Sequence, residues 1–147
     1  MKKKISILCV LLALAVLFSA CDVNSNMEPA VRQMLDALCA GDIDTAKTYL
    51  HPDIFKINDD PTAGLLQIST LLAGRTVTEM KQTNMYVTMK FGTDFTGRQE
   101  QGIFVLTLND GTQCQLEATY FDGTSKGFMG FYIHFEQSQF QPGSSAV

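Results

Sequence analysis

The spacing of apolar residues divides the chain into three regions. An apolar run, interrupted only by Ser6, covers residues 5–18, directly after three lysines. Beyond it, apolar residues recur every three or four positions as far as residue 72, which is the spacing of amphipathic helices. After Arg75 they mostly alternate with polar residues, which is the spacing of strands with one buried face. The pattern predicts helices first and a sheet afterwards.

The helical region predicts three helices separated by helix-ending signals. The first covers residues 27–38, with Asn26 as its N-cap. The second follows Asp42 and runs to residue 50, because His51 precedes a proline. The third covers residues 61–72 after the capping Asp60. Residues 53–57 are expected to form a short strand.

The alternating region predicts four long strands joined by turns. Turn signals at Asp110-Gly111 and between residues 122 and 127 favour antiparallel hairpins. The predicted fold class is therefore α+β, with three N-terminal helices packed on a bent, mainly antiparallel sheet of four long strands plus one short strand. The tail after residue 137 has no apolar spacing.

The apolar run near the N-terminus is typical of a secretory signal. Its fourteen residues would span about 21 Å as a helix, which is shorter than the roughly 30 Å hydrocarbon core of a bilayer. The tetrad Phe18-Ser19-Ala20-Cys21 resembles the lipobox of bacterial lipoproteins, although Phe18 departs from the usual Leu. This resemblance implies lipidation at Cys21; the alternative is an ordinary signal with an incidental cysteine. The expected organisation is a lipoprotein signal peptide at 1–20, a tether at 21–27, one domain at 28–137 and a tail at 138–147.

Charge narrows the class of partner. Without the three leader lysines, 8 basic and 15 acidic residues remain, which gives a net charge of −7. Such an acidic body excludes nucleic acid as a partner and does not bind an anionic bilayer by charge. The membrane is therefore expected to be contacted through a lipidated Cys21, on the extracytoplasmic face of the cell membrane.

Two cysteines, Cys39 and Cys114, remain in the expected domain. In an oxidising compartment they could form a disulfide, since one falls on the first helix and the other on the sheet that this helix would cover. Free cysteines are also common as small buried apolar residues. Neither Cys-x-x-Cys nor His-x-x-x-His spacing occurs, so no metal site or cofactor is predicted.

The order of elements resembles the nuclear transport factor 2-like fold, in which a bent sheet closes into a cone over an N-terminal helix. Residues 35–53, LDALCAGDIDTAKTYLHPD, look like the helix-Gly-Asp-helix opening of small bacterial lipoproteins of that superfamily. The resemblance implies a cone-like roll over residues 28–137. It says little about activity, because the superfamily includes isomerases, dehydratases and transport factors. Its enzymes place a carboxylate, histidine or tyrosine inside the cone.

A two-residue turn at Asp110-Gly111 would set the faces of the sheet. In that register the core face carries no Asp, Glu or His, and Thr107 and Tyr120 are its only polar groups. No catalytic residue is therefore predicted. Glu117 and His134 would face outward. His51 is interpreted as a partner for helix-end carbonyls, and Asp59-Asp60 as helix capping.

The same register places large apolar side chains on the outer face, where they suggest a partner surface. Its occupant would be a second copy of the chain or another envelope protein. A strongly bent sheet that buries both faces explains the pattern equally well. Methionines in the cone could instead line a site for a small apolar ligand, or simply fill the core. The residues of the partner face are Phe104, Leu106, Leu108, Phe128 and Tyr132; the methionines are Met34, Met85, Met89 and Met129.

Together these features predict a lipid-anchored, extracytoplasmic binding or interaction domain without catalytic activity. The alternative is a small isomerase- or hydratase-like enzyme with a cone-shaped pocket.

Overall fold

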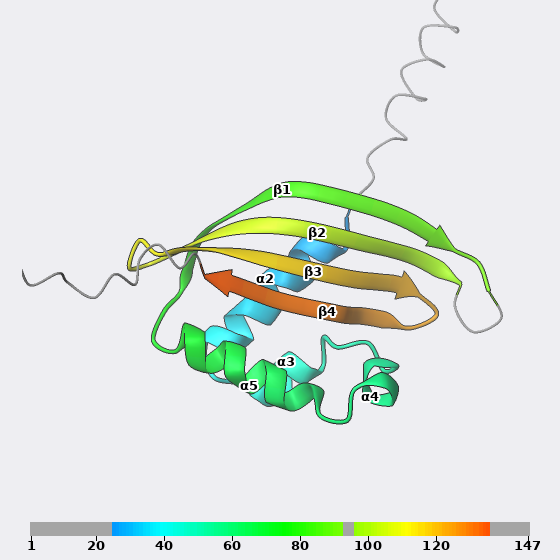
Figure 1. Ribbon diagram of the computed structural model, residues 1–147, viewed down its shortest axis with the longest axis horizontal. Coiled ribbons are helices and arrows are strands. Elements are labelled where there is room, and N and C mark those ends of the chain that lie inside the picture. The colour runs from blue at the N-terminus through cyan, green and yellow to red at the C-terminus, as the bar shows by residue number, and fades with distance from the viewer. Residues whose placement is uncertain (1–24, 93–95, 136–147) are drawn as a thin grey trace, which may run out of the picture.

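The computed structural model describes residues 25–92 and 96–135, so Cys21 and the whole leader lie outside the described residues. Within these ranges the chain is an α+β domain, as predicted (Figure 1). Its elements are α2 (Met27–Cys39), α3 (Ile43–Lys47), α4 (Ile54–Ile57), α5 (Pro61–Leu72), β1 (Val77–Lys90), β2 (Gly97–Leu108), β3 (Gln113–Gly123) and β4 (Lys126–Phe135).

Three of the four described helices, α2, α3 and α5, begin where the sequence predicts. Asp42 caps α3 by accepting from the Thr45 amide, and Asp60 caps α5 by accepting from the amides of Thr62 and Ala63. Asn26 precedes α2 but its side chain makes no capping hydrogen bond. The second helix is shorter than predicted, since it ends at Lys47. None of the helices in the described part of the chain combines the length and apolarity needed to cross a membrane.

The expected short strand at residues 53–57 is wrong. Residues 54–57 form the one-turn helix α4, while the strand-like contact falls just upstream, where Leu50 pairs in parallel with Phe128 of β4. The His51 amide donates to the Phe128 carbonyl at 3.0 Å, and the Phe128 amide donates to the Tyr49 carbonyl at 2.8 Å. Pro52 has no amide hydrogen to extend this pairing, so the segment turns into a helix instead.

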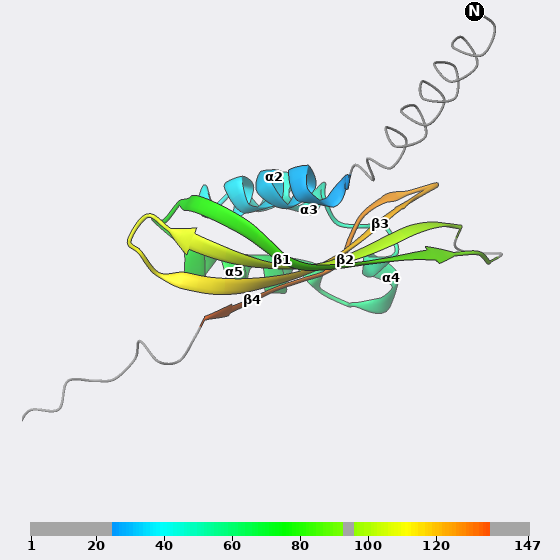
Figure 2. The same cartoon turned by 90° about the horizontal axis from the view of Figure 1, so that it is seen from above.

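The four long strands form one open antiparallel sheet in the order β1-β2-β3-β4, which confirms the predicted hairpins. Helix α2 lies against one face of this sheet (Figure 2). Helices α3, α4 and α5 gather beyond the β4 edge (Figure 1). Strand β1 forms the opposite edge of the sheet: β2 pairs with it on one side, and no strand of the described residues pairs with it on the other.

The register between β2 and β3 differs by one residue from the prediction. The loop contains three residues, Asn109 to Gly111: the Leu108 amide donates to the Thr112 carbonyl at 2.9 Å, and the Gly111 amide donates to the Leu108 carbonyl at 2.9 Å. Cys114 therefore lies opposite Leu106, not opposite Thr107. A slip of one residue turns every side chain of a strand to the other face.

The predicted partner face is wrong for four of its five residues. The corrected β2 register turns Phe104, Leu106 and Leu108 toward α2, where they are buried. Phe128 is also buried, because a bulge opposite Thr119 and Tyr120 makes Met129 the extra residue. Only Tyr132 remains on the outer face, with 61% of its surface exposed.

The core lies between α2 and the sheet. Of the four methionines expected there, only Met34 is fully buried. Met85 and Met129 are partly exposed, and Met89 is 54% exposed. Cys39 and Cys114 are free cysteines in this structure, not a disulfide. The buried apolar residues are Met27, Ala30, Val31, Met34, Leu35, Ala37, Leu38, Ala46, Leu50, Leu65, Leu72, Phe104, Leu106, Leu108, Cys114, Leu116, Ala118, Tyr120, Phe128 and Phe131.

Candidate functional site

A carboxylate is buried on the helix-covered face of the sheet, which contradicts the predicted absence of acidic groups there. Glu100 has no exposed surface. It lies on β2, on the same face as Phe104, with Val87 opposite on β1 and Tyr120 opposite on β3. Sequence reasoning missed Glu100 because the two-residue turn placed its strand with the wrong face inward.

Two side chains hold this carboxylate. Arg98, two residues earlier on the same face of β2, places its Nε 3.0 Å from Glu100 Oε1. The Arg98 N–H does not point at that oxygen, so the pair is held by charge more than by an aligned hydrogen bond. The Ser25 hydroxyl donates to Glu100 Oε2 at 2.5 Å. Glu100 Oε1 is therefore paired by charge without a hydrogen bond, whereas the hydrogen bond from Ser25 to Oε2, made to a charged group, is among the stronger ones.

A second carboxylate continues the cluster toward the surface. Asp122 Oδ1 lies 2.8 Å from Lys126 Nζ, and its Oδ2 accepts from the Asn26 amide group at 2.6 Å. The hydrogen bond from Lys126 lowers the pKa of Asp122. Burial raises the pKa of the neighbouring Tyr120, and the charge of Asp122 adds to this effect. We call Ser25, Asn26, Arg98, Glu100, Asp122 and Lys126 the Glu100 cluster.

The Glu100 cluster ties the start of the described chain to the sheet. Ser25 and Asn26, 75 and 96 residues from their carboxylate partners in sequence, each donate one hydrogen bond to the sheet. This explains why Asn26 does not cap α2. Ser25 Oγ stands in as an acceptor for the Met27 amide, at 3.2 Å. The geometry is that of an anchor for the N-terminal segment.

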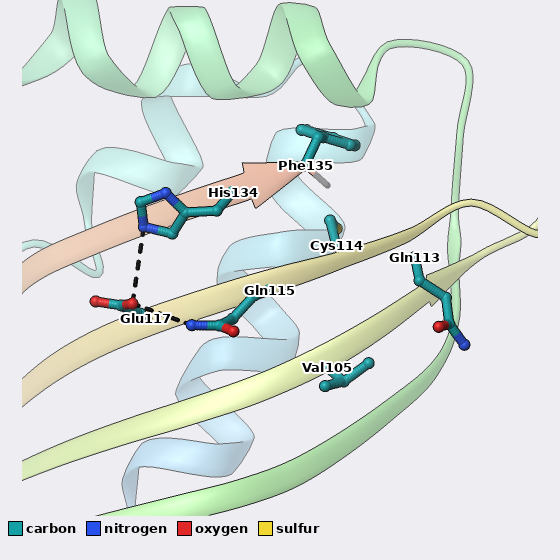
Figure 3. A pocket seen from close by; sticks show the side chains of 7 residues that line it. All are labelled: Val105, Gln113, Cys114, Gln115, Glu117, His134 and Phe135. Carbon is teal, nitrogen blue, oxygen red and sulfur yellow. Dashed lines mark hydrogen bonds and ion pairs between the residues drawn. The ribbon is translucent and has the colours of Figure 1, made fainter. Parts of the chain in front are cut away.

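A shallow hollow of about 290 Å³ opens on the face of the sheet opposite to α2, near the start of β3 and the end of β4 (Figure 3). Glu117 Oε1 accepts from Gln115 Nε2 at 3.1 Å and lies 3.9 Å from His134 Nε2. Both Glu117 and His134 face outward, as predicted. The lining residues are Val105, Gln113, Cys114, Gln115, Glu117, His134 and Phe135.

The polar groups of this hollow suit recognition better than proton transfer. The side chains of Glu117 and His134 are 49% and 60% exposed, so water screens their attraction. Amide, carboxylate and imidazole groups on a solvated face can exchange hydrogen bonds with a polar ligand. Neither this hollow nor a second one of about 80 Å³, between α2 and β1, has Glu100 in its lining.

His51 is buried but belongs to neither hollow. Its Nδ1 accepts from the Asp53 amide at 3.2 Å, and its ring packs edge-on against Phe121 with the ring centres 5.4 Å apart. It therefore does not serve helix-end carbonyls as predicted; it fills the junction between the helices and the sheet. Asp60 caps α5, as expected. No group of three or more metal-ligating side chains occurs among residues 25–92 and 96–135.

The surroundings of the Cys39 and Cys114 thiols make them unreactive. Burial raises the pKa of Cys114 to about 11 and raises that of Cys39 as well. The charge of Cys39 contributes to the shift at Cys114, which indicates that the thiols are near one another. Nucleophilic cysteines have lowered pKa values, so this pair is not a candidate catalytic centre.

Comparison of this chain with protein-family models, with curated proteins and with solved structures gives no match.

Proposed function

We propose that this chain is a lipid-anchored domain on the extracytoplasmic face of a membrane and that it works by binding. The single observation that carries the proposal is Cys21, placed directly after a lysine-led apolar run and two small residues. The Glu100 cluster is consistent with it, since the folded domain begins only four residues beyond that cysteine. A domain so close to its anchor would work at the membrane surface.

Binding is favoured over catalysis because of how the ionisable groups are placed. Glu100 is the one fully buried carboxylate of the described residues; Ser25 donates to its Oε2, Arg98 pairs with its Oε1 by charge, and it lines neither hollow. A general base must come within hydrogen-bond distance of a substrate proton, and Glu100 is enclosed away from both hollows. The outer hollow offers polar groups instead, which favours a polar ligand or a protein partner over the small apolar ligand expected from the methionines.

The isomerase- or hydratase-like alternative has one observation in its favour. A buried carboxylate beside a tyrosine whose pKa is raised is a pairing that proton-transfer enzymes use. For that reading, a substrate would have to displace Ser25 from Glu100. Native mass spectrometry of gently purified protein separates the two: a retained small molecule that is lost in Glu100→Gln favours the enzyme, and a partner protein or a ligand retained in that variant favours binding.

We also propose that the domain is a nuclear transport factor 2-like roll. Support comes from α2 lying across one face of the sheet and from the order of the helices before the strands. The proposed interior differs from a catalytic cone, because apolar side chains and the Glu100 cluster fill the space beside α2.

Labelling tests the anchor directly. Cells that produce the chain are grown with labelled palmitate, and the protein is isolated and its label measured. The wild type and the control Cys9→Ser, which alters the other leader cysteine, should both carry label, while Cys21→Ser should carry none. Label retained in Cys21→Ser would overturn the proposed lipid anchor.

A further inference from the structure

An apolar strip at one end of the sheet has no cover among the described residues. Val87 and Met89 are 45% and 54% exposed, and Phe91, just beyond β1, is 79% exposed. Val87 pairs with Glu100 and Met89 with Arg98, so both lie on the face that α2 covers elsewhere. We call Val87, Met89 and Phe91 the apolar strip. Neighbouring exposed apolar groups of this size mark a contact surface.

The strip is bare because α2 does not reach it. The helix begins at Met27, beside the Glu100 cluster, and the hairpin of β1 and β2 extends past that point (Figure 2). A longer helix would bury these strand positions, but here they are exposed to solvent.

The chain leaves the described structure next to this strip. Ser25 is bonded to Glu100, and Glu100 is the cross-strand partner of Val87. Ser25 is the fourth residue after Cys21. Even a fully extended chain of four residues spans only about 14 Å. A lipid on Cys21 therefore holds the bilayer surface within that distance of Ser25, whose partner Glu100 lies opposite Val87 of the strip.

We infer that the apolar strip docks into the surface of the lipid bilayer beside the anchor; this rests on the proposed lipidation of Cys21. Phe91 and Met89 enter the boundary between headgroups and acyl chains, as interfacial apolar side chains do. The strip is too small to hold a domain of net negative charge at a membrane alone. The anchor makes the contact effective by keeping the two surfaces at high local concentration.

A second copy of the chain is the competing occupant. The short distance to Cys21 favours the bilayer, because the membrane is then always present at the strip and a second copy is present only by encounter. Docking together with the Ser25 and Asn26 hydrogen bonds would fix how the domain is oriented, so that the outer hollow has a defined direction relative to the membrane.

The chain contains no tryptophan, which allows a direct test. Phe91→Trp places one fluorophore on the strip, and the matched control Tyr132→Trp places one on the exposed outer face. Each processed full-length protein is extracted from membranes and reconstituted into phosphatidylcholine vesicles, with or without bromine on the acyl chains. We expect bromine to quench the emission of Phe91→Trp and to leave that of Tyr132→Trp unchanged. The emission of Phe91→Trp should also lie at shorter wavelength.

Flotation of the same vesicles separates the two possible failures. Protein that floats with the vesicles but shows no bromine quenching at position 91 overturns the docking and leaves the anchor standing. Emission at position 91 that shifts only with protein concentration assigns the strip to a second copy and also overturns it. Protein that does not float refutes the anchor and the docking together.

Discussion

Replacing Arg98 with methionine should destabilise the domain strongly. Methionine keeps much of the length and apolar volume of the arginine stem but removes its charge. Glu100 would then be a buried carboxylate with only the Ser25 hydroxyl as partner. Removing one member of a buried ion pair costs about 3 to 5 kcal/mol. Because 22% of the Arg98 side chain is exposed, we expect about 3 kcal/mol, a large part of the roughly 5 to 15 kcal/mol by which domains are stable.

The double variant Arg98→Met/Glu100→Met tests the cause. It removes the stranded charge and places methionine beside Val87 and Tyr120, so it should be more stable than Arg98→Met despite carrying an additional substitution. The coupling between the two positions should be about 2 kcal/mol. A control is Arg32→Met, which breaks the exposed pair with Glu28 and should cost less than about 1 kcal/mol.

Urea unfolding followed by far-ultraviolet circular dichroism measures these differences on the chain without residues 1–21. The slope of free energy against urea should be the same in all the proteins compared, including the single variant Glu100→Met that completes the cycle, so that midpoints can be compared. Additive effects, or a loss for Arg98→Met no larger than for Arg32→Met, would refute the view that Arg98 neutralises Glu100.

Four further predictions follow from the packing and the pKa shifts. Gly127→Ala should destabilise by more than about 2 kcal/mol in urea unfolding, because its φ is +146° and an added Cβ would lie 2.5 Å from the His51 amide nitrogen. Gly64→Ala, in open space on α5, should stabilise by about 0.5 to 1 kcal/mol by the same measurement. Cys114 has its pKa raised from 9.0 to about 11, so its stabilising contribution is complete below pH 9 and is lost as pH rises toward 11, by about 2 to 3 kcal/mol. Cys114→Ala should flatten that alkaline loss in unfolding curves measured across the range. Asp122 has a pKa lowered from 3.8, so it stabilises the fold above pH 3.8 and loses this effect as the pH falls further. Asp122→Asn should therefore make the loss of stability in acid less steep. An unchanged acid profile would show that Asp122 does not hold Lys126 as described.

Local signals in the sequence predicted most of the elements. Side-chain caps and apolar spacing placed the starts of α3 and α5, since these depend on residues within one turn. Alternation and turn residues placed the four strands and their antiparallel pairing. The helix α4 escaped this reasoning because residues 53–57 have neither spacing clearly enough, and the backbone pairing of Leu50 with β4 decides the path there.

The candidate site was harder to predict because it depends on which face each strand turns inward. Phe128 is buried and Met129 is not, owing to one bulge residue that alternation cannot reveal. The Glu100 cluster joins residues 75 and 96 positions apart, and no local pattern brings Ser25 or Asn26 to the sheet. One signal was available: Arg98 and Glu100 lie two apart on a strand, which places opposite charges side by side on one face.

The loop between β2 and β3 explains why the structure adopts a register that buries an acid. In the predicted register Ile103, Val105 and Thr107 would replace Phe104, Leu106 and Leu108 in the core. The apolar gain of the observed register is then about one large side chain, roughly 2 to 3 kcal/mol. Burying Glu100 costs free energy that offsets this gain, so apolar packing alone does not select the observed register. A two-residue hairpin turn of the favoured type would require a positive φ at Asp110, at a cost of about 1 to 2 kcal/mol. The three-residue loop needs a positive φ only at Gly111, which has φ +82°. Turn geometry therefore favours the observed register, and the buried carboxylate that results pairs with Arg98 and holds Ser25 against the sheet.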